Sequence, residues 1–93
     1  MLTAKEAREL SGKTVEEKVE SLLESIREKA KTGARKIATG YSHKEDADLW
    51  ISGGYSKTDD WKRAKGILEG LGYKVTFFYE ERQFVDMYTL VEW

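Results

Sequence analysis

The side chains that could do chemistry in this sequence are concentrated between residues 41 and 57. This segment holds the only histidine, one of the three tryptophans, two of the five tyrosines and the only adjacent pair of glycines. Connections between helices and strands usually span about 4–6 residues, and much longer ones are typically functional or disordered. Because disordered segments contain few aromatic residues, we expect residues 41–57 to form an ordered, exposed binding element.

The residue types in this segment suit a ligand that carries a flat ring and a phosphate. Tyr41, Trp50 and Tyr55 can stack against a planar base. The backbone amides of Gly53 and Gly54 can approach an anion closely, because no side chain stands in the way.

Three further side chains complete this candidate ligand site. Lys57, together with Arg82 from a later polar turn, can supply positive charge to a phosphate. His43 lies within the same segment and is counted with the ligand-binding residues. In the alternative interpretation, Trp50 and Ile51 pack on a sheet and the glycine pair makes a turn.

Catalytic and metal-binding patterns are weak in this sequence. The chain has no cysteine, which excludes thiol nucleophiles, disulfides and thiolate metal sites. A serine triad would have to use His43, and neither a Gly-x-Ser-x-Gly elbow nor a glycine-rich phosphate loop is present. Glu45, Asp46 and Asp48 could bind a divalent cation, but they lack EF-hand spacing and are more typical of solvated loop acids. We expect a non-enzymatic protein without cofactor or metal.

Composition places the chain among small globular proteins. With 93 residues and 40% hydrophobic residues, we expect one domain over residues 1–93, with a functional loop or extra strand at 42–57. The net charge of −1 does not indicate a nucleic-acid-binding protein. The sequence shows neither a signal-peptide pattern nor an apolar run of about 20 residues, so we expect no membrane association and a cytoplasmic location.

Three threonines mark helix starts. Thr3 with Glu6 and Thr14 with Glu17 form capping-box patterns, and Thr58 can cap a further helix. The three helices are expected to end near Leu10, near Gly33 and between Gly70 and Gly72.

Three stretches have strand character, at 35–41, 73–79 and 83–92, and the last two form a hairpin. Residues 48–52 are assigned as an added strand, with a helical turn over 43–51, capped by Ser42, as the alternative. The strand–helix–strand order predicts parallel pairing. We therefore predict an α+β fold in which helices are followed by a small three- to four-stranded mixed sheet (α-α-β-(β)-α-β-β) with helices on one face.

Two surfaces could bind a partner. The last strand carries apolar residues on both faces, with Val85, Met87 and Val91 on one and Phe84, Tyr88 and Leu90 on the other. Large exposed apolar patches are rare on monomers, so we expect a homo-oligomer, most simply a symmetric dimer. A row of acids on the second helix forms either a docking ridge or a solvated face; it consists of Glu16, Glu20, Glu24 and Glu28.

The order of elements resembles that of small tailed-phage accessory proteins. The resemblance rests on the opening segment 2–10, the long charged helix, the turn at 71–75 and the terminal strand ending in Glu92 and Trp93. It implies an anti-defence protein in the host cytoplasm, and some such proteins are non-enzymatic sponges that sequester cyclic or ADP-ribose-type nucleotide signals. No residue-level motif of a sponge carries over, so the resemblance assigns no site residues.

The sequence thus favours a non-enzymatic, phage-type protein that sequesters a nucleotide-like immune signal, either an ADP-ribose derivative or a cyclic nucleotide. The alternative is a protein-interaction module that inhibits a host protein through the acidic ridge or the exposed sheet face.

Overall fold

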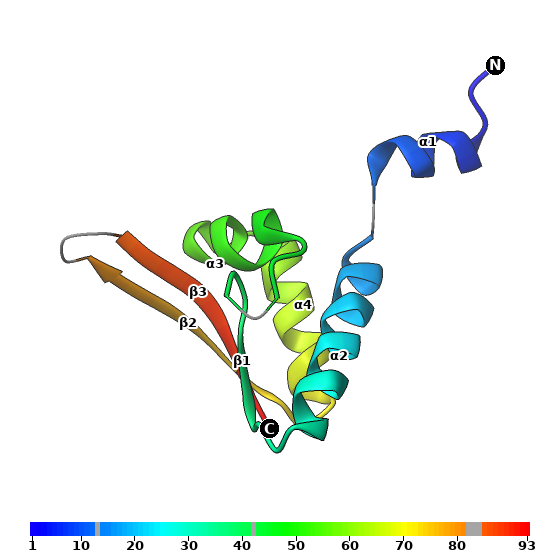
Figure 1. Ribbon diagram of the computed structural model, residues 1–93. Helices are drawn as coiled ribbons and strands as arrows, with labels where there is room; N and C mark the ends of the chain where they lie inside the picture. Colours follow the sequence, from blue (N-terminus) through cyan, green and yellow to red (C-terminus); the bar gives the residue numbers. More distant parts are fainter. Residues whose placement is uncertain (13, 42, 82–84) are drawn as a thin grey trace.

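The computed structural model describes residues 1–12, 14–41, 43–81 and 85–93. Its elements, shown in Figure 1, follow one another in the order α1 (Ala4–Ser11), α2 (Val15–Lys31), β1 (Lys36–Ala38), the π-helical turn η1 (Asp48–Ser52), α3 (Gly53–Ser56), α4 (Asp59–Gly70), β2 (Lys74–Glu81) and β3 (Val85–Glu92). This combination of helices and a three-stranded sheet confirms the predicted α+β class.

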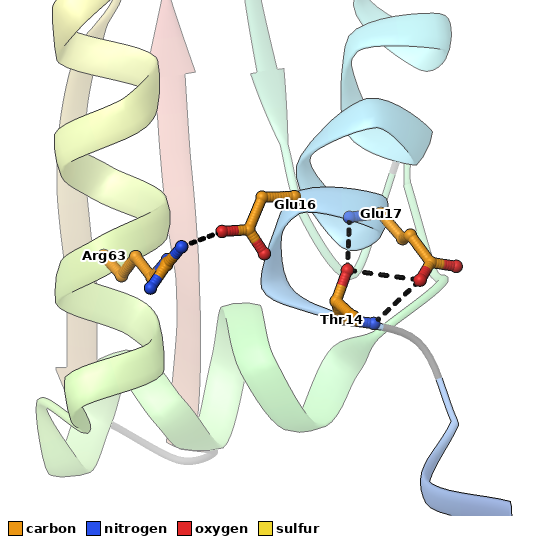
Figure 2. A network of polar contacts seen from close by, with 4 residues as sticks. All are labelled: Thr14, Glu16, Glu17 and Arg63. Atoms are coloured by element: carbon orange, nitrogen blue, oxygen red, sulfur yellow. Dashed lines mark hydrogen bonds and ion pairs between the residues drawn. The ribbon is translucent and has the colours of Figure 1, made fainter. Parts of the chain in front are cut away.

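Helices α1, α2 and α4 start directly after the predicted threonines Thr3, Thr14 and Thr58. At the start of α2, the Glu17 amide donates to Thr14 Oγ1 at 3.2 Å, and the Thr14 amide donates to the Glu17 carboxylate at 3.4 Å (Figure 2). This reciprocal pair satisfies two backbone donors that the helix itself leaves without a partner. At the start of α4, Thr58 Oγ1 accepts from the Trp61 amide at 3.2 Å, without a return bond from the third residue.

The core lies between the helices and one face of the sheet. Val19, Leu22 and Ile26 are the buried residues of α2, and they recur at the spacing of one helix face. Burying each such side chain contributes about 1.5–3 kcal/mol. Ala30, four residues beyond Ile26 on the same helix face, is exposed in the last turn. The remaining apolar core residues are Ile37, Leu49, Trp50, Trp61, Ala64, Leu68, Val75 and Val91.

The sheet has the order β1-β3-β2, and both pairings are antiparallel. Ile37 of β1 and Val75 of β2 both lie opposite Val91 of β3. The expected mixed sheet is therefore wrong, because β3 lies between β1 and β2 and separates the two strands that were predicted to pair. These two strands still run in the same direction, as a strand–helix–strand connection requires.

The added strand expected at residues 48–52 is also wrong, because these residues form η1, which continues directly into α3. Leu49 and Trp50 are adjacent, and both are buried. A strand with one buried face turns successive side chains to opposite sides, whereas a helical turn can direct two neighbours into the same core. The alternative of a helical turn was thus closer to the structure, and its proposed cap, Ser42, lies outside the described residues.

A buried polar cluster joins the sheet to η1 and α4. Thr89 of β3 donates through its hydroxyl to the Trp50 carbonyl, and the same hydroxyl accepts from the Trp61 indole N–H at 3.0 Å. The Thr39 hydroxyl accepts from the Thr89 amide and donates to the Thr89 carbonyl, both at 3.0 Å. These bonds satisfy polar groups whose burial without a partner would cost about 1–3 kcal/mol each.

Helix α1 stands apart from the rest of the chain, as Figure 1 shows. Among the described residues it makes no contact with another helix or strand. Its separation explains why the radius of gyration is 14.4 Å, above the roughly 12 Å expected for a compact chain of this length.

Candidate functional site

The predicted ligand-binding residues do not form one site, and four of them are buried, beginning with Trp50 and His43. Trp50 is fully buried, and only 4% of the His43 surface is exposed. His43 Nδ1 lies 2.8 Å from the hydroxyl of Ser25 on α2, which attaches the segment before η1 to that helix. Neither ring can be reached by a ligand from solvent. The position of Trp50 agrees with the alternative interpretation, in which this side chain packs inside the fold.

The glycine pair is buried in the first turn of α3 rather than forming an exposed anion loop. A Cβ atom on Gly54 would lie 2.5 and 2.7 Å from two ring carbons of Phe77 and 3.0 Å from the Trp61 indole nitrogen. The position therefore requires glycine because the chain passes directly against two aromatic rings. Gly53 packs against Thr58 and the start of η1.

Tyr41 lies on the other side of the sheet from the helices. Its hydroxyl donates to Asp86, and its ring packs edge-on against Tyr88 with centroids 5.4 Å apart. The bond to Asp86 raises the pKa of Tyr41 above its usual value, because loss of the phenol proton would break this bond and place two negative charges next to each other. Tyr41 thus belongs to a sheet surface and cannot meet a ligand at α3.

Tyr55 and Lys57 remain together, at the end of α3. Tyr55 is 58% exposed, and its ring centroid lies 5.4 Å from that of Tyr79 on β2. The Tyr79 hydroxyl donates to Glu81 at 3.1 Å, and this bond raises the pKa of Tyr79. Lys57 ends α3 in the left-handed region, with φ of 51°. Arg82 lies outside the described residues.

Lys57 leads to a groove that the sequence did not indicate. It runs between α4 and the edge of β2 and has a volume of about 670 Å³. The lining residues are Lys57, Trp61, Lys62, Lys65, Gly66, Glu69, Val75, Thr76 and Phe77. Because β2 is an edge strand, its outer backbone groups are available to hydrogen-bond a ligand.

The groove is positively charged although the whole chain carries a net charge of −1. Lys65 forms an ion pair with Glu69 at 3.2 Å. Lys57 and Lys62 are both exposed, and neither has an ion-pair partner within the described residues. Two cations are therefore available to an anionic ligand beside the half-buried ring of Phe77.

Sequence reasoning found Lys57 but missed Lys62 and Phe77. Lys62, Gly66 and Glu69 recur at helical spacing, which places them on one face of α4, and this was the available signal. The spacing alone does not show that this face borders the edge of a strand, because that depends on the position of β2 in the sheet.

The acidic row on α2 is partly neutralised. Glu16 accepts a charge-assisted hydrogen bond from Arg63 of α4 (Figure 2). The pKa of Glu16 is lowered, mainly by a hydrogen bond from its own backbone amide and to a lesser extent by the bond from Arg63. Glu28 pairs with Lys31 at 3.4 Å. Within the described ranges, no three histidine, aspartate or glutamate side chains are grouped to hold a metal ion.

Over the part of the chain that the structure describes, no helix combines the length and apolar character needed to cross a membrane. Comparison with known proteins gives no match to any protein-family model, curated protein or solved structure.

Proposed function

We propose that this protein binds a phosphate-bearing, nucleotide-like small molecule in the groove between α4 and β2, and that it holds this ligand without converting it. The observation that carries the proposal is the charge of the groove. Lys57 and Lys62 stand beside a hollow of about 670 Å³ with no ion-pair partner among the described residues. That volume lies within the roughly 300–1,000 Å³ of small-molecule sites.

The other walls of the groove suit the remainder of such a ligand. The Phe77 ring is half-buried and offers a stacking surface for a base. Trp61 meets Phe77 edge-on, with centroids 6.2 Å apart and an interplanar angle of 85°. Because the Trp61 indole N–H donates to Thr89, Trp61 supports the Phe77 ring and leaves hydrogen bonding to the lysines and the β2 edge.

The backbone of Lys57 gives independent support. A residue with a side chain is disfavoured in the left-handed region by about 1–2 kcal/mol, and glycine is the common residue where a helix ends this way. Lysine occupies this position with φ of 51°. Strained residues cluster at binding sites, so a lysine in this conformation supports a role for its ammonium group in ligand binding.

The resemblance to tailed-phage accessory proteins supplies the biological setting of the proposal. A nucleotide held but not converted is withdrawn from any receptor that senses it. Sequestration of an ADP-ribose-type or cyclic nucleotide signal would therefore counter a host defence.

The test is a thermal-shift screen against ADP-ribose derivatives, cyclic dinucleotides and mononucleotides, with the matching nucleosides as phosphate-free controls. A ligand present at 100 times its Kd adds about 2.7 kcal/mol to the free energy of unfolding. At about 4–8 °C per kcal/mol for a domain of this size, Tm rises by about 10 °C or more. Mass spectrometry of the bound fraction then shows whether the ligand is recovered intact.

Lys57→Gly is the variant that separates binding from folding. It removes one cation and relieves the left-handed strain, so the free protein is as stable as the wild type or more stable, while the ligand-induced shift is lost. The control is Arg27→Gln with Lys31→Gln, which removes two exposed cations of α2 and should leave the shift unchanged. An unshifted Tm across the panel contradicts the binding proposal, and a released product contradicts sequestration.

A further inference from the structure

The face of the sheet turned away from the helices is uncovered. Figure 1 shows α2, α3 and α4 on one side of the sheet only. Ile37, Val75 and Val91 point to the helices and are buried, so the residues that alternate with them point to the opposite side. We name this the open face; its residues are Lys36, Ala38, Lys74, Thr76, Phe78, Glu80, Asp86, Tyr88, Leu90 and Glu92.

The centre of the open face is an ordered aromatic cluster. Phe78 and Tyr88 are opposite each other in the register of β2 and β3, and their rings stack with centroids 4.8 Å apart. Tyr41 packs edge-on against Tyr88 and is held by its hydrogen bond to Asp86. An apolar surface that is ordered in this way loses little side-chain entropy when a partner covers it.

The charges of the open face are separated along the strands. At one end, Lys36 and Lys74 both lie opposite Glu92, which gives this end a net positive charge. At the other end, the carboxylate residues Glu80 and Asp86 lie opposite each other, and we call this pair the acidic end. The six residues from Asp86 to Glu92 separate the two ends by about 20 Å, with the aromatic cluster between them.

We propose that two copies of this chain pack open face to open face, related by a two-fold axis that lies between the sheets and runs across the strands. This axis, midway between the two ends, places the basic end of each copy over the acidic end of the other, and it brings the Phe78–Tyr88 clusters of the two copies next to each other. A two-fold axis parallel to the strands would bring like charges together, which is unfavourable. The charge pattern therefore selects both the partner and its orientation.

The size of the face sets the strength of the contact. Three strands at about 4.8 Å spacing and, in β2 and β3, eight residues at about 3.4 Å rise give a patch of at most about 14 by 27 Å, because β1 adds only the residues Lys36–Ala38. This patch, below about 400 Å² per copy, is smaller than the roughly 800 Å² per partner of standard stable interfaces, so the dimer should be weak and concentration-dependent. Sedimentation velocity between about 1 and 500 µM should show a species with twice the 10.7 kDa mass of one chain, and high salt should weaken it.

Charge reversals on the open face test the orientation. Lys36→Glu with Lys74→Glu makes both ends acidic and should raise the dimer dissociation constant about tenfold or more. Glu80→Lys with Asp86→Lys makes both ends basic and should have the same effect. Mixing the two variants should restore association, because each acidic end then meets a basic one. Arg27→Glu with Lys31→Glu on α2 is the control and should dimerise like the wild type.

Thermal melts of each variant confirm that it is folded, so loss of association cannot be assigned to unfolding. A wild-type protein that remains monomeric at 500 µM overturns the proposal, and so does a Lys36→Glu, Lys74→Glu variant that dimerises as well as the wild type. Failure of the mixed variants to associate overturns the proposed orientation.

Discussion

Replacing Gly54 by alanine tests the packing of residues 53–56 against the sheet. The added methyl group would lie 2.5 and 2.7 Å from ring carbons of Phe77, which is well inside van der Waals contact. Trp61, on the other side, is tied to Thr89 by a 3.0 Å hydrogen bond. The Phe77 ring must therefore move, or α3 must shift away from β2.

Two opposing effects set the magnitude. Alanine in place of glycine within a helix stabilises by about 1 kcal/mol, whereas overpacking costs typically about 1–3 kcal/mol. We expect Gly54→Ala to reduce the free energy of unfolding by up to about 2 kcal/mol. Gly66 of α4 is the matched control, because it is helical and a Cβ atom there would have no atom within 4 Å. Gly66→Ala should stabilise by about 0.5–1 kcal/mol.

Urea denaturation followed by circular dichroism measures both variants. Because the helical preference is common to both substitutions, the difference between them reports the close contact of the added methyl group with Phe77 and Trp61. That difference should be about 1–3 kcal/mol, or at least about 4 °C in Tm. In a Phe77→Leu background the cost of Gly54→Ala should fall, since neighbouring changes are not additive. If Gly54→Ala stabilises as much as Gly66→Ala, the close packing of α3 against β2 is incorrect.

Two further predictions concern Trp50 and Tyr41. Trp50→Ala should reduce the free energy of unfolding by about 3–5 kcal/mol, which is much of the total of about 5–14 kcal/mol expected for this length, and the urea midpoint would show the loss. Trp50→Phe should bind ligand like the wild type. If it folds but no longer binds, the core position of Trp50 is contradicted. The pKa of Tyr41 is raised by Asp86, so its absorbance at alkaline pH should titrate above the usual value of about 10, and Asp86→Asn should remove this shift. Because this pKa is raised in the folded state, the hydrogen bond stabilises the fold below about pH 10, and the stabilisation is lost as the pH rises through the folded-state pKa. The difference in free energy of unfolding between the wild type and Asp86→Asn should therefore shrink over that range. A difference that stays constant would refute the link between this pKa and stability.

The features that were predictable from sequence are those decided by near neighbours. Thr14 and Glu17 are three residues apart, and their reciprocal hydrogen bonds follow from helix geometry. Thr58 identified the start of α4 for the same reason. The hairpin of β2 and β3 also involves strands that are consecutive in the chain.

The features that were missed depend on distant packing. The run Leu49 to Ile51 is short and apolar, and periodicity does not distinguish a buried strand from a buried helical turn at that length. Its burial beneath Thr89, a residue of the last strand, decided the outcome. The same burial removed Trp50 from the candidate site, while Lys57 stayed on the surface because α3 ends there.

The central position of β3 also constrains how the chain can fold during its synthesis. The hydrogen bonds between Thr39 and Thr89 join residues 50 positions apart, and β1 and β2 each pair with β3. At about 5–20 residues per second, a ribosome needs about 2–9 s to proceed from Ala38 to Val85. Throughout that interval the apolar side of β1 has no sheet to join, so α2 can form early but the core closes in one late, cooperative step.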